Sequence, residues 1–230
     1  MKRNIILICL VCVPTLFGCE LNRKTTIVLV RHGQTVANIN HILVGRGLDS
    51  ELTSLGEAQA AARGKSFESK YHFDSFYCSS LKRTENTGKI ILQNMSNQEQ
   101  ISPVVLSGLD DIDYGLATGM TVEEATSTFG GVEFTTNFGA FDDANYSPSF
   151  TQENSKAWLT RFESSLNSIC EQEKGHTVLV MIHGACYNWG QYRFGEENVL
   201  SLANCGFAEL EYTLGKLKLN VWSGDSPVIS

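Results

Sequence analysis

Two unbroken apolar runs, each ending in a histidine and a glycine, constrain the fold of this chain more than any other feature. Thr26 to Val30 is a β-branched and apolar run that leads into Arg31-His32-Gly33. Thr177 to Ile182 is a second run, and it leads into His183-Gly184. Runs of this length and composition are typical of strands that are buried on both faces of a sheet. The chain is therefore expected to contain a sheet that helices cover on both sides.

Strands and helices are predicted to alternate along the rest of the chain. The predicted helices cover 53–70, 82–93 and 155–173, and the predicted strands cover 73–78, 104–106 and the two arms of a hairpin over 207–222. Thr53 is expected to cap the first helix and Gly175 to close the last one. This alternation indicates an α/β fold, a three-layer αβα sandwich with a largely parallel central sheet.

Polar residues stand where the predicted strands end. Ligands of αβα sandwiches bind beyond the carboxyl ends of the strands. Arg31-His32, Ser79-Ser80 and His183-Gly184 all fall at such ends. The sequence therefore predicts one site in which two histidines and an arginine come together.

Residues 119–154 differ from the rest of the chain, because their apolar residues show no clear period. They hold five phenylalanines and one tyrosine among Gly, Thr, Asn and Asp. One interpretation is an irregular surface excursion whose aromatic side chains form a small satellite core. Another is a lid over the pocket that shapes substrate choice, and both can hold together.

The N-terminus is predicted to be an export signal. A basic head, Lys2-Arg3, precedes the stretch Ile5 to Phe17, which is apolar apart from Thr15. This stretch is too short for a membrane span, which needs about 20 apolar residues. Leu16-Phe17-Gly18-Cys19 resembles a bacterial lipobox, in which cleavage leaves the Cys19 sulfur free to take up diacylglycerol. Phe17 departs from the lipobox pattern, and the alternative is an ordinary signal peptide with a chance cysteine.

This interpretation divides the chain into three parts. Residues 1–18 are a lipoprotein signal peptide, 19–25 a tether, and 26–230 one domain large enough for a sizeable core. The mature protein is then expected to be exported and anchored to a membrane, in the periplasm or at the cell surface.

Charge and cysteine spacing exclude several kinds of partner. The formal net charge is −7, and it becomes −9 when the two positive charges of the signal are removed. Nucleic acid is not an expected partner, because polyanion binding needs a basic face. An anionic substrate would have to be bound by a few local arginines against this net field. The four cysteines beyond Cys19 match no metal-site spacing and are interpreted as buried thiols: Cys78, Cys170, Cys186 and Cys205.

Five short motifs follow one another along the chain. They are Arg31-His32-Gly33-Gln34-Thr35 with Asn38, Leu52-Thr53-x-x-Gly56-x-x-Gln59, Ser80-Leu81-Lys82-Arg83-Thr84, Leu109-x-Asp111-x-x-x-Gly115, and His183-Gly184. In type and order they resemble the motifs of the histidine phosphatase superfamily, also called the phosphoglycerate mutase-like family, and Asn204 fits a family asparagine near the last strands. The match runs from about Thr26 to Leu210, and five ordered motifs rarely arise by chance. The resemblance implies a phosphoglycerate mutase-like fold and phosphoryl transfer without a cofactor.

The resemblance also assigns roles to the site residues. It implies that His32 attacks phosphorus, that Arg31, Arg83 and His183 bind the three phosphoryl oxygens, and that Asn38 adds a neutral donor. These residue types suit the chemistry. A phosphate monoester repels nucleophiles by its own charge, which bidentate arginines offset. A neutral imidazole is a good nucleophile at neutral pH and avoids repulsion between two anions.

The proton donor of the family is expected at Asp111, from alignment on Leu109 and Gly115. Many family members have glutamate there, and aspartate is one methylene shorter. Asp110 is the alternative donor, and a further interpretation is that Asp110, Asp111 and Asp113 are all solvated turn carboxylates. A metal site is not expected, because the sequence has no HxH, HxxxH or HExxH pair.

Together these features predict a metal-independent, histidine acid phosphatase-like phosphomonoesterase for a small phosphorylated substrate. The first alternative is a phosphoglycerate mutase-type phosphotransferase. Export favours hydrolysis, because such mutases work on cytosolic metabolites. The second alternative is a surface lipoprotein that binds a phosphorylated ligand without turnover, although a pure binder gains nothing from a nucleophile.

Overall fold

The computed structural model describes residues 23–129, 153–195 and 202–229. Cys19, the predicted signal peptide and residues 130–152 of the predicted excursion lie outside them. The described elements are β1 (Thr25–Arg31), α2 (Val36–Ile39), α3 (Ser54–Phe67), β2 (Ser75–Cys78), α4 (Lys82–Gln93), β3 (Val104–Val105), the 3₁₀ helices η1 (Ser107–Leu109) and η2 (Gly115–Ala117), α5 (Val122–Phe129), α7 (Ser155–Gln172), β4 (Thr177–Ile182), α8 (Cys186–Phe194), β5 (Phe207–Thr213) and β6 (Lys216–Ser223).

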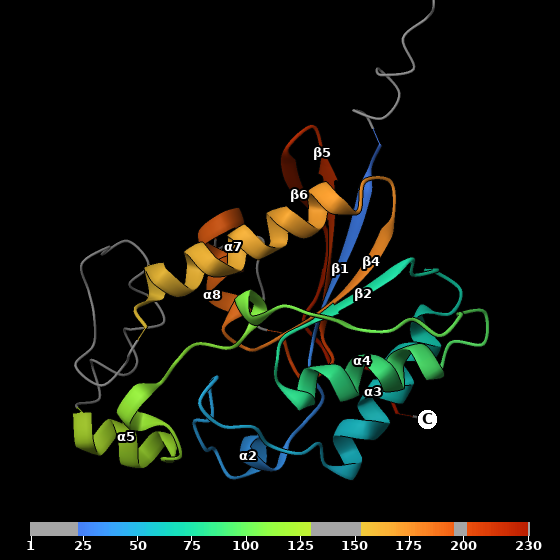
Figure 1. The fold of residues 1–230 in the computed structure, drawn as a ribbon. Helices are drawn as coiled ribbons and strands as arrows, with labels where there is room; N and C mark the ends of the chain where they lie inside the picture. Colours follow the sequence, from blue (N-terminus) through green and yellow to red (C-terminus); the bar gives the residue numbers. More distant parts are fainter. Residues whose placement is uncertain (1–22, 130–152, 196–201, 230) are drawn as a thin grey trace, which may run out of the picture.

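The strands form one mixed sheet in the order β3-β2-β4-β1-β5-β6 (Figure 1). β3, β2, β4 and β1 are parallel to one another, whereas β5 pairs antiparallel with both β1 and β6. The prediction of a largely parallel sheet is thus confirmed for β3, β2, β4 and β1. The predicted hairpin is also confirmed and adds an antiparallel edge. Its turn, Leu214-Gly215, has φ of 52° and 76°, which matches the right-handed twist of the flanking strands.

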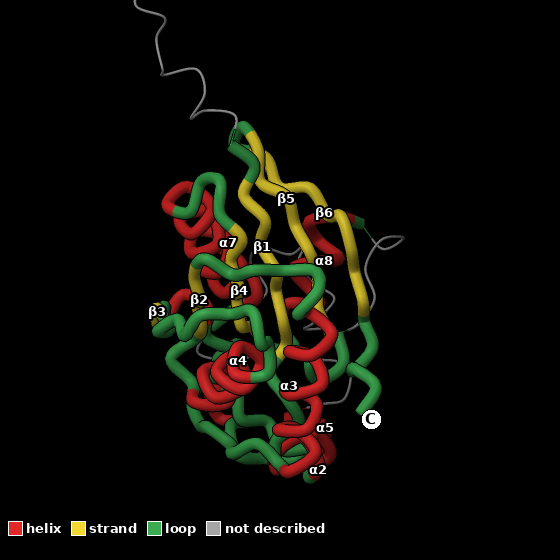
Figure 2. Tube along the Cα trace, turned by 90° about the vertical axis from the view of Figure 1, so that its right-hand side faces the viewer, coloured by secondary structure: helices red, strands yellow, loops and turns green. Residues whose placement is uncertain are grey.

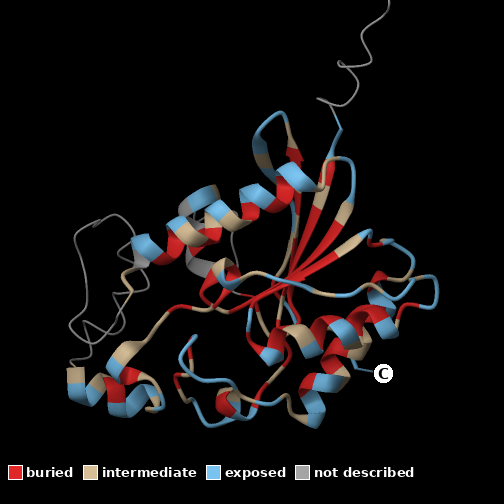
Figure 3. Ribbon diagram, viewed as in Figure 1, coloured by how far each residue is buried: buried red, intermediate tan, exposed pale blue. Residues whose placement is uncertain are grey.

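Helices cover both faces of the sheet (Figure 2). On β1 and β4, one set of alternate residues, including Ile27 and Val180, packs against α7 and α8. The other set, including Val28 and Leu179, packs against α3 and α4. The central strands are therefore buried from both sides (Figure 3). The three-layer sandwich is confirmed, and it explains why these two strands consist of unbroken apolar runs.

The pairing of β1 with β4 brings the two histidines together. The strands run parallel, with Arg31 level with Ile182 in the register. The next residues on the two strands, His32 and His183, therefore leave the sheet side by side. Their ring centroids lie 5.4 Å apart. The predicted convergence at the strand ends is thus a consequence of register.

The other predicted elements differ from the observed ones mainly at their ends. α3, α4 and α7 fall within the predicted helices, and Thr53 accepts the hydrogen bond of the Gly56 amide as the predicted cap of α3. α7 is capped by Glu173, and Gly175 lies two residues beyond with a positive φ. The structure also contains α2 and α8, which the sequence pattern did not indicate.

The interpretation of 119–154 as wholly irregular is wrong for 122–129, which form α5. The helix begins with a local capping arrangement, in which the Thr121 hydroxyl accepts from the Glu124 amide and the Glu124 carboxylate accepts from the Thr121 amide. Phe129 packs with Leu43, Ala117 and Ala125 in a small cluster, as the satellite-core interpretation expected. The lid interpretation concerns mainly residues outside the described ones. None of the described helices is long and apolar enough to span a membrane.

Candidate active site

The candidate nucleophile His32 follows β1 and is 4% exposed. Its amide donates to the Ile182 carbonyl at 3.1 Å, and its carbonyl accepts from the Asn204 amide group at 3.1 Å, so the backbone is fixed on both sides. Nδ1 of its ring lies 2.8 Å from the Gly33 carbonyl. Because a carbonyl can only accept, Nδ1 carries the proton. The neutral ring then has its lone pair on Nε2, as a nucleophile requires.

The loop after β1 is held against α3 and α4 by contacts that admit only glycine. A Cβ on Gly33 would lie 2.5 Å from the Gly56 carbonyl oxygen, and one on Gly56 would lie 2.1 Å from the Gln34 carbonyl oxygen. The Gly33 amide donates to the Thr87 hydroxyl at 3.0 Å, and the Gln34 amide donates to the Gln59 side chain at 3.0 Å. The glycine and glutamine of the second sequence motif therefore position the loop that bears His32.

His183 is 1% exposed, and a chain of hydroxyl groups determines its tautomer. The Thr84 hydroxyl donates to the Leu81 carbonyl at 2.7 Å, so it can only accept from Ser79, which lies 2.8 Å away. Ser79 thus uses its single proton on Thr84. It must accept from the His183 Nε2, 2.9 Å away. The neutral His183 ring therefore keeps its lone pair on Nδ1, directed toward the site.

Arg31 and Arg83 lie at the same end of the sheet as the histidines. The Arg31 Nη1 donates to the Leu202 carbonyl at 2.7 Å. Arg83 extends from α4 and is 1% exposed. Its Nη atoms donate to the carbonyls of Gly45 and Leu48 and to two carboxylates. These contacts fix both guanidinium groups before any ligand binds.

Three buried polar atoms of the site have no hydrogen-bond partner among the described residues. They are Nε of Arg31, Nε of Arg83 and Nδ1 of His183. Buried polar atoms are nearly always paired in proteins, so each exception needs an explanation. Two cationic donors and an imidazole nitrogen around one histidine form a set that suits an anion with several oxygens. The three residues are among the four that the sequence predicted as phosphate ligands, the fourth being Asn38.

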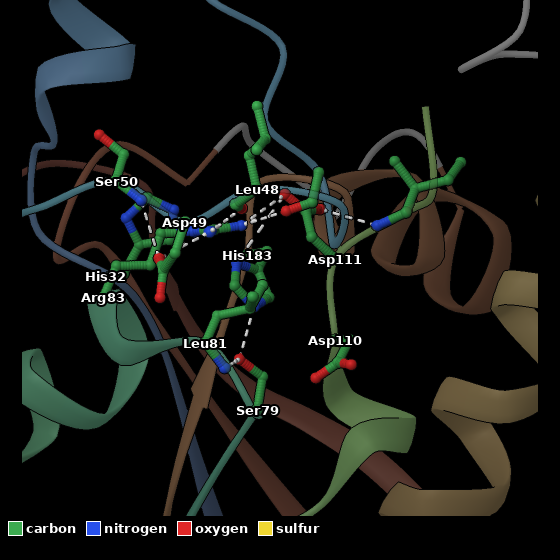
Figure 4. Close-up of polar contacts among 12 residues, drawn as sticks. His32, Leu48, Asp49, Ser50, Ser79, Leu81, Arg83, Asp110, Asp111 and His183 are labelled. Carbon is green, nitrogen blue, oxygen red and sulfur yellow. Dashed lines mark hydrogen bonds and ion pairs between the residues drawn. The ribbon is translucent and has the colours of Figure 1, made fainter. Parts of the chain in front are cut away.

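The structure separates the two adjacent aspartates (Figure 4). Asp111 Oδ2 lies 3.3 Å from Arg83 Nη2 and 3.8 Å from His183 Nδ1, inside the site. Asp110 instead accepts from the amide and the hydroxyl of Ser80, both at 2.8 Å. Its other oxygen lies 3.6 Å from Arg46. Asp110 thus joins η1 to the end of β2, and Asp111 is the carboxylate beside the histidines.

Asn38, the remaining predicted phosphate ligand, lines the same cavity as His32. Asn38 Oδ1 accepts from the Thr35 amide at 3.1 Å and from the Asn204 side chain at 3.2 Å. Its Nδ2 group is then the part that can donate to a ligand. Asp113 accepts from the Gly115 amide at 2.8 Å and acts as a turn carboxylate, as one interpretation expected for it.

A cavity of about 510 Å³ opens in front of His32 and Asp111. Its other walls combine apolar and polar residues in similar measure. They are formed by Ala37, Ile42, Leu43, Val44, Tyr114, Val122 and Ala185 together with Arg31, Asn38, His41, Gly45, Gly184 and Asn204. Tyr114, Val122 and His41 were not among the predicted site residues, because nothing in their sequence context distinguishes a pocket wall from a surface.

Burial shifts the pKa values of the site in directions that suit proton transfer. Loss of hydration, and then the charges of Arg31 and Arg83, hold the pKa of His32 well below its usual value. Burial likewise lowers the pKa of His183, with Arg83 as the next cause. Burial raises the pKa of Asp111, although the nearby arginines oppose it. These shifts favour the neutral form of both histidines and make Asp111 easier to protonate than an exposed aspartate.

The sequence analysis interpreted the cysteines as buried thiols and expected no metal site. All four described cysteines are buried free thiols, which confirms their interpretation. Across 23–129, 153–195 and 202–229, no group of three or more His, Cys, Asp or Glu side chains could hold a metal ion.

The fold and the site define an α/β protein with a buried histidine pair and two arginines that are suited to bind a phosphoryl group. Comparison with known proteins leads to the same class of protein. The sequence profile of the histidine phosphatase superfamily (branch 1) matches residues 27–225. The chain belongs to this superfamily, and the resemblance seen in the sequence is confirmed.

Individual relatives include both mutases and phosphatases. A 2,3-bisphosphoglycerate-dependent phosphoglycerate mutase of Bartonella bacilliformis is 34% identical over 108 residues, which cover 46% of this chain and 52% of the relative. A broad-specificity phosphatase of Saccharomyces cerevisiae is 35% identical over 114 residues, 49% of each chain. The matches thus span about half the length of these relatives. Among solved structures, a phosphoglycerate mutase of Bacillus anthracis has a TM-score of 0.78 at 19% identity and covers 90% of this chain and 96% of its own. This last likeness shows the fold.

Proposed function

We propose that this protein is a phosphomonoester hydrolase that acts through a phosphohistidine on His32. The observation that carries the proposal is the arrangement around Nε2 of His32. A neutral, oriented nucleophile shares one buried site with the unpaired Nε atoms of Arg31 and Arg83 and with Nδ1 of His183. In this proposal the two arginines bind the phosphoryl oxygens. Asn38 adds a neutral donor, and His183 takes a proton on Nδ1 when the dianion arrives and then donates it to a third oxygen.

The proposed reaction has two steps. Nε2 of His32 attacks phosphorus while the bond to the leaving oxygen breaks, and Asp111 gives its proton to that oxygen so that an alcohol departs. Water then attacks the phosphohistidine, and the ionised Asp111 accepts a proton from it. The phosphorus–nitrogen bond breaks, and inorganic phosphate and neutral His32 are restored. The raised pKa of Asp111 supports its role as the acid in the first step.

Transfer of the phosphoryl group to a second substrate is the alternative function. The curated relatives that are named mutases favour it. The aliphatic and aromatic residues of the lining, such as Leu43 and Tyr114, favour hydrolysis of an ester with a partly apolar organic group, because Arg31 is the only arginine or lysine among the described lining residues. An acceptor assay separates the two functions, since a mutase needs a phosphorylated acceptor product and a phosphatase releases phosphate.

We also propose that the mature protein is exported and anchored to a membrane through lipid on Cys19. The support is the basic head, the short apolar stretch and the Leu16-Phe17-Gly18-Cys19 boundary. Intact-mass measurement on membrane fractions should reveal a diacylglyceryl adduct on Cys19. Stable attachment further implies a multiply acylated terminus, because one chain gives only weak binding. A soluble mature form with an unmodified cysteine would refute this proposal.

The central experiment is to assay wild type and His32→Ala with a panel of phosphoesters, with and without a hydroxyl acceptor. Wild type should release inorganic phosphate, and rapid quenching should trap an acid-labile, base-stable phosphoryl adduct. His32→Ala should show neither. Near-normal turnover in His32→Ala would overturn the assignment, and binding of phosphoesters by wild type without turnover would identify a phosphoester-binding lipoprotein instead.

A further inference from the structure

Arg161 of α7 uses every hydrogen-bond donor of its guanidinium group. Nη1 donates to the carbonyls of Gly108 at 3.1 Å and Asp110 at 2.6 Å, and one proton of Nη2 goes to the carbonyl of Asp111 at 2.7 Å. The second Nη2 proton and the Nε proton go to the two carboxylate oxygens of Glu153, at 2.8 Å and 2.6 Å. A guanidinium has five N–H donors, so none is left for another partner. Three of the five hold the main chain that carries Asp111.

Other residues on the same face of α7 hold this turn as well. Trp158, three positions before Arg161, donates from its indole to the Asp110 carbonyl at 3.2 Å. Ser165, four positions after Arg161, packs against Gly108, where an added Cβ would lie 1.8 Å from the serine hydroxyl. α7 and η1 are therefore in intimate contact along one turn-spaced row of side chains. α7 therefore holds the Asp111 backbone from one side, and the contact between Asp110 and Ser80 at the end of β2 holds it from the other.

We propose that Arg161, oriented by Glu153, is a positioning residue that sets the Asp111 carboxyl group against the leaving oxygen. The inference rests on the proposed function, in which Asp111 is the proton donor. Asp111 has few other fixed contacts, namely Arg83 at 3.3 Å and its own hydrogen bond from the Ile112 amide at 3.0 Å. Its side chain is short, so it has little freedom to compensate for a displaced backbone. A displacement of about 1 Å at a catalytic group can lower the rate by about 10²-fold.

The test is the dependence of rate on the leaving group. Arg161→Met keeps much of the side-chain volume but removes all five donors. It should lower kcat/KM about 10- to 100-fold for β-glycerophosphate, whose alkoxide needs a proton, and much less for 4-nitrophenyl phosphate, whose phenolate leaves unaided. Arg161→Lys, which has three donors in a different geometry, should recover only part of the loss. Glu153→Gln provides an independent variant should Arg161→Met fail to fold, and it should show a smaller loss with the same selectivity.

Arg63→Met is the matched control. Arg63 is also a buried arginine that donates to main-chain carbonyls, those of Cys205 at 2.7 Å and Asp225 at 3.0 Å. Within the described part of the chain it makes no hydrogen bond or ion pair with the Asp111 turn, so its removal should lower stability and slow hydrolysis of both substrates by the same factor. If Arg161→Met and Glu153→Gln also slow both substrates equally, Arg161 only stabilises the fold and the inference is wrong.

The double variant Asp111→Asn/Arg161→Met separates this inference from the proposed function. If Arg161 acts through Asp111, the double variant should hydrolyse β-glycerophosphate within about twofold of Asp111→Asn, because coupled residues are not additive. Additive losses would refute the positioning role while leaving Asp111 as donor. If Asp111→Asn itself shows no leaving-group dependence, the proton-donor assignment fails first, and the inference fails with it.

Discussion

Asparagine substitutions at the adjacent Asp110 and Asp111 should affect different properties, stability for Asp110 and catalytic rate for Asp111. Asp111→Asn keeps the shape of the side chain but removes the proton that, in the proposed mechanism, goes to the alkyl leaving group. General acid catalysis contributes about 10²–10⁴-fold, so kcat/KM for β-glycerophosphate should fall by that factor. The value for 4-nitrophenyl phosphate should change little. Because burial already disfavours the charged form of Asp111, the amide should leave the free energy of unfolding close to that of wild type.

Asp110→Asn should act on stability instead. The Asp110 carboxylate is buried and accepts two hydrogen bonds from Ser80, with Arg46 close to its second oxygen. Hydrogen bonds to charged groups contribute about 1.5–3 kcal/mol each, and an amide oxygen retains part of this, so the loss should be about 1–3 kcal/mol. Urea unfolding followed by circular dichroism measures it. If kcat/KM falls at all, it should fall by the same factor for both substrates.

The pH profile gives the same experiment a second readout. Asp111 must be protonated to act, so β-glycerophosphate hydrolysis should fall as pH rises through the raised pKa of Asp111. Asp111→Asn should lose this limb of the profile. The reasoning is refuted if Asp110→Asn, and not Asp111→Asn, discriminates between the substrates. Equal slowing of both substrates in both variants would mean that the donor lies elsewhere in the chain.

Three further predictions follow from the site. Activity should survive exhaustive EDTA treatment, because Arg31 and Arg83 supply the positive charge that a cation would; a loss restored by zinc or magnesium would contradict this mechanism. Ser79→Ala removes the partner of the His183 Nε2 and should cost about 1–3 kcal/mol in urea unfolding, with lower activity on both substrates; unchanged values would disprove the tautomer assignment. The third prediction concerns the Asp111→Asn variant, whose free energy of unfolding should decline as pH falls below about 6.5. The reason is that His32 and His183 take up protons in this range only when the protein is unfolded. Adding His183→Gln should weaken this decline, and an unchanged slope would contradict the burial argument.

Much of this site could be predicted from the sequence, because its main components follow local patterns. Two apolar runs are typical of strands buried on both faces, and a histidine stands at the end of each. Both histidines were therefore expected at one edge of the sheet, and the observed pairing of β1 with β4 places His32 and His183 next to each other. The helix that begins at Lys82 delivers Arg83 to the same edge, as the third motif implied.

Short elements and turns could not be predicted in the same way. α2, α5 and α8 are too short for a helical period to show in the sequence. For α5, the Thr121-x-x-Glu124 capping pattern is nevertheless a sequence signal of a helix start. The antiparallel pairing of β5 with β1 depends on contacts between segments about 180 residues apart in the chain, and no local pattern encodes it.

The difference between Asp110 and Asp111 was decided by the tertiary structure alone. In the sequence they are neighbouring, chemically identical carboxylates, and family alignment only favoured the second. In the fold, Ser80 draws the first toward the end of β2, and Arg161 holds the carbonyls of both so that the second turns toward His183. A side chain's direction depends on backbone angles fixed by partners some 30 to 50 residues away. The sequence by itself determined which chemical groups the protein has at the strand ends, and only the packing of α7 on η1 decided which carboxylate joins them.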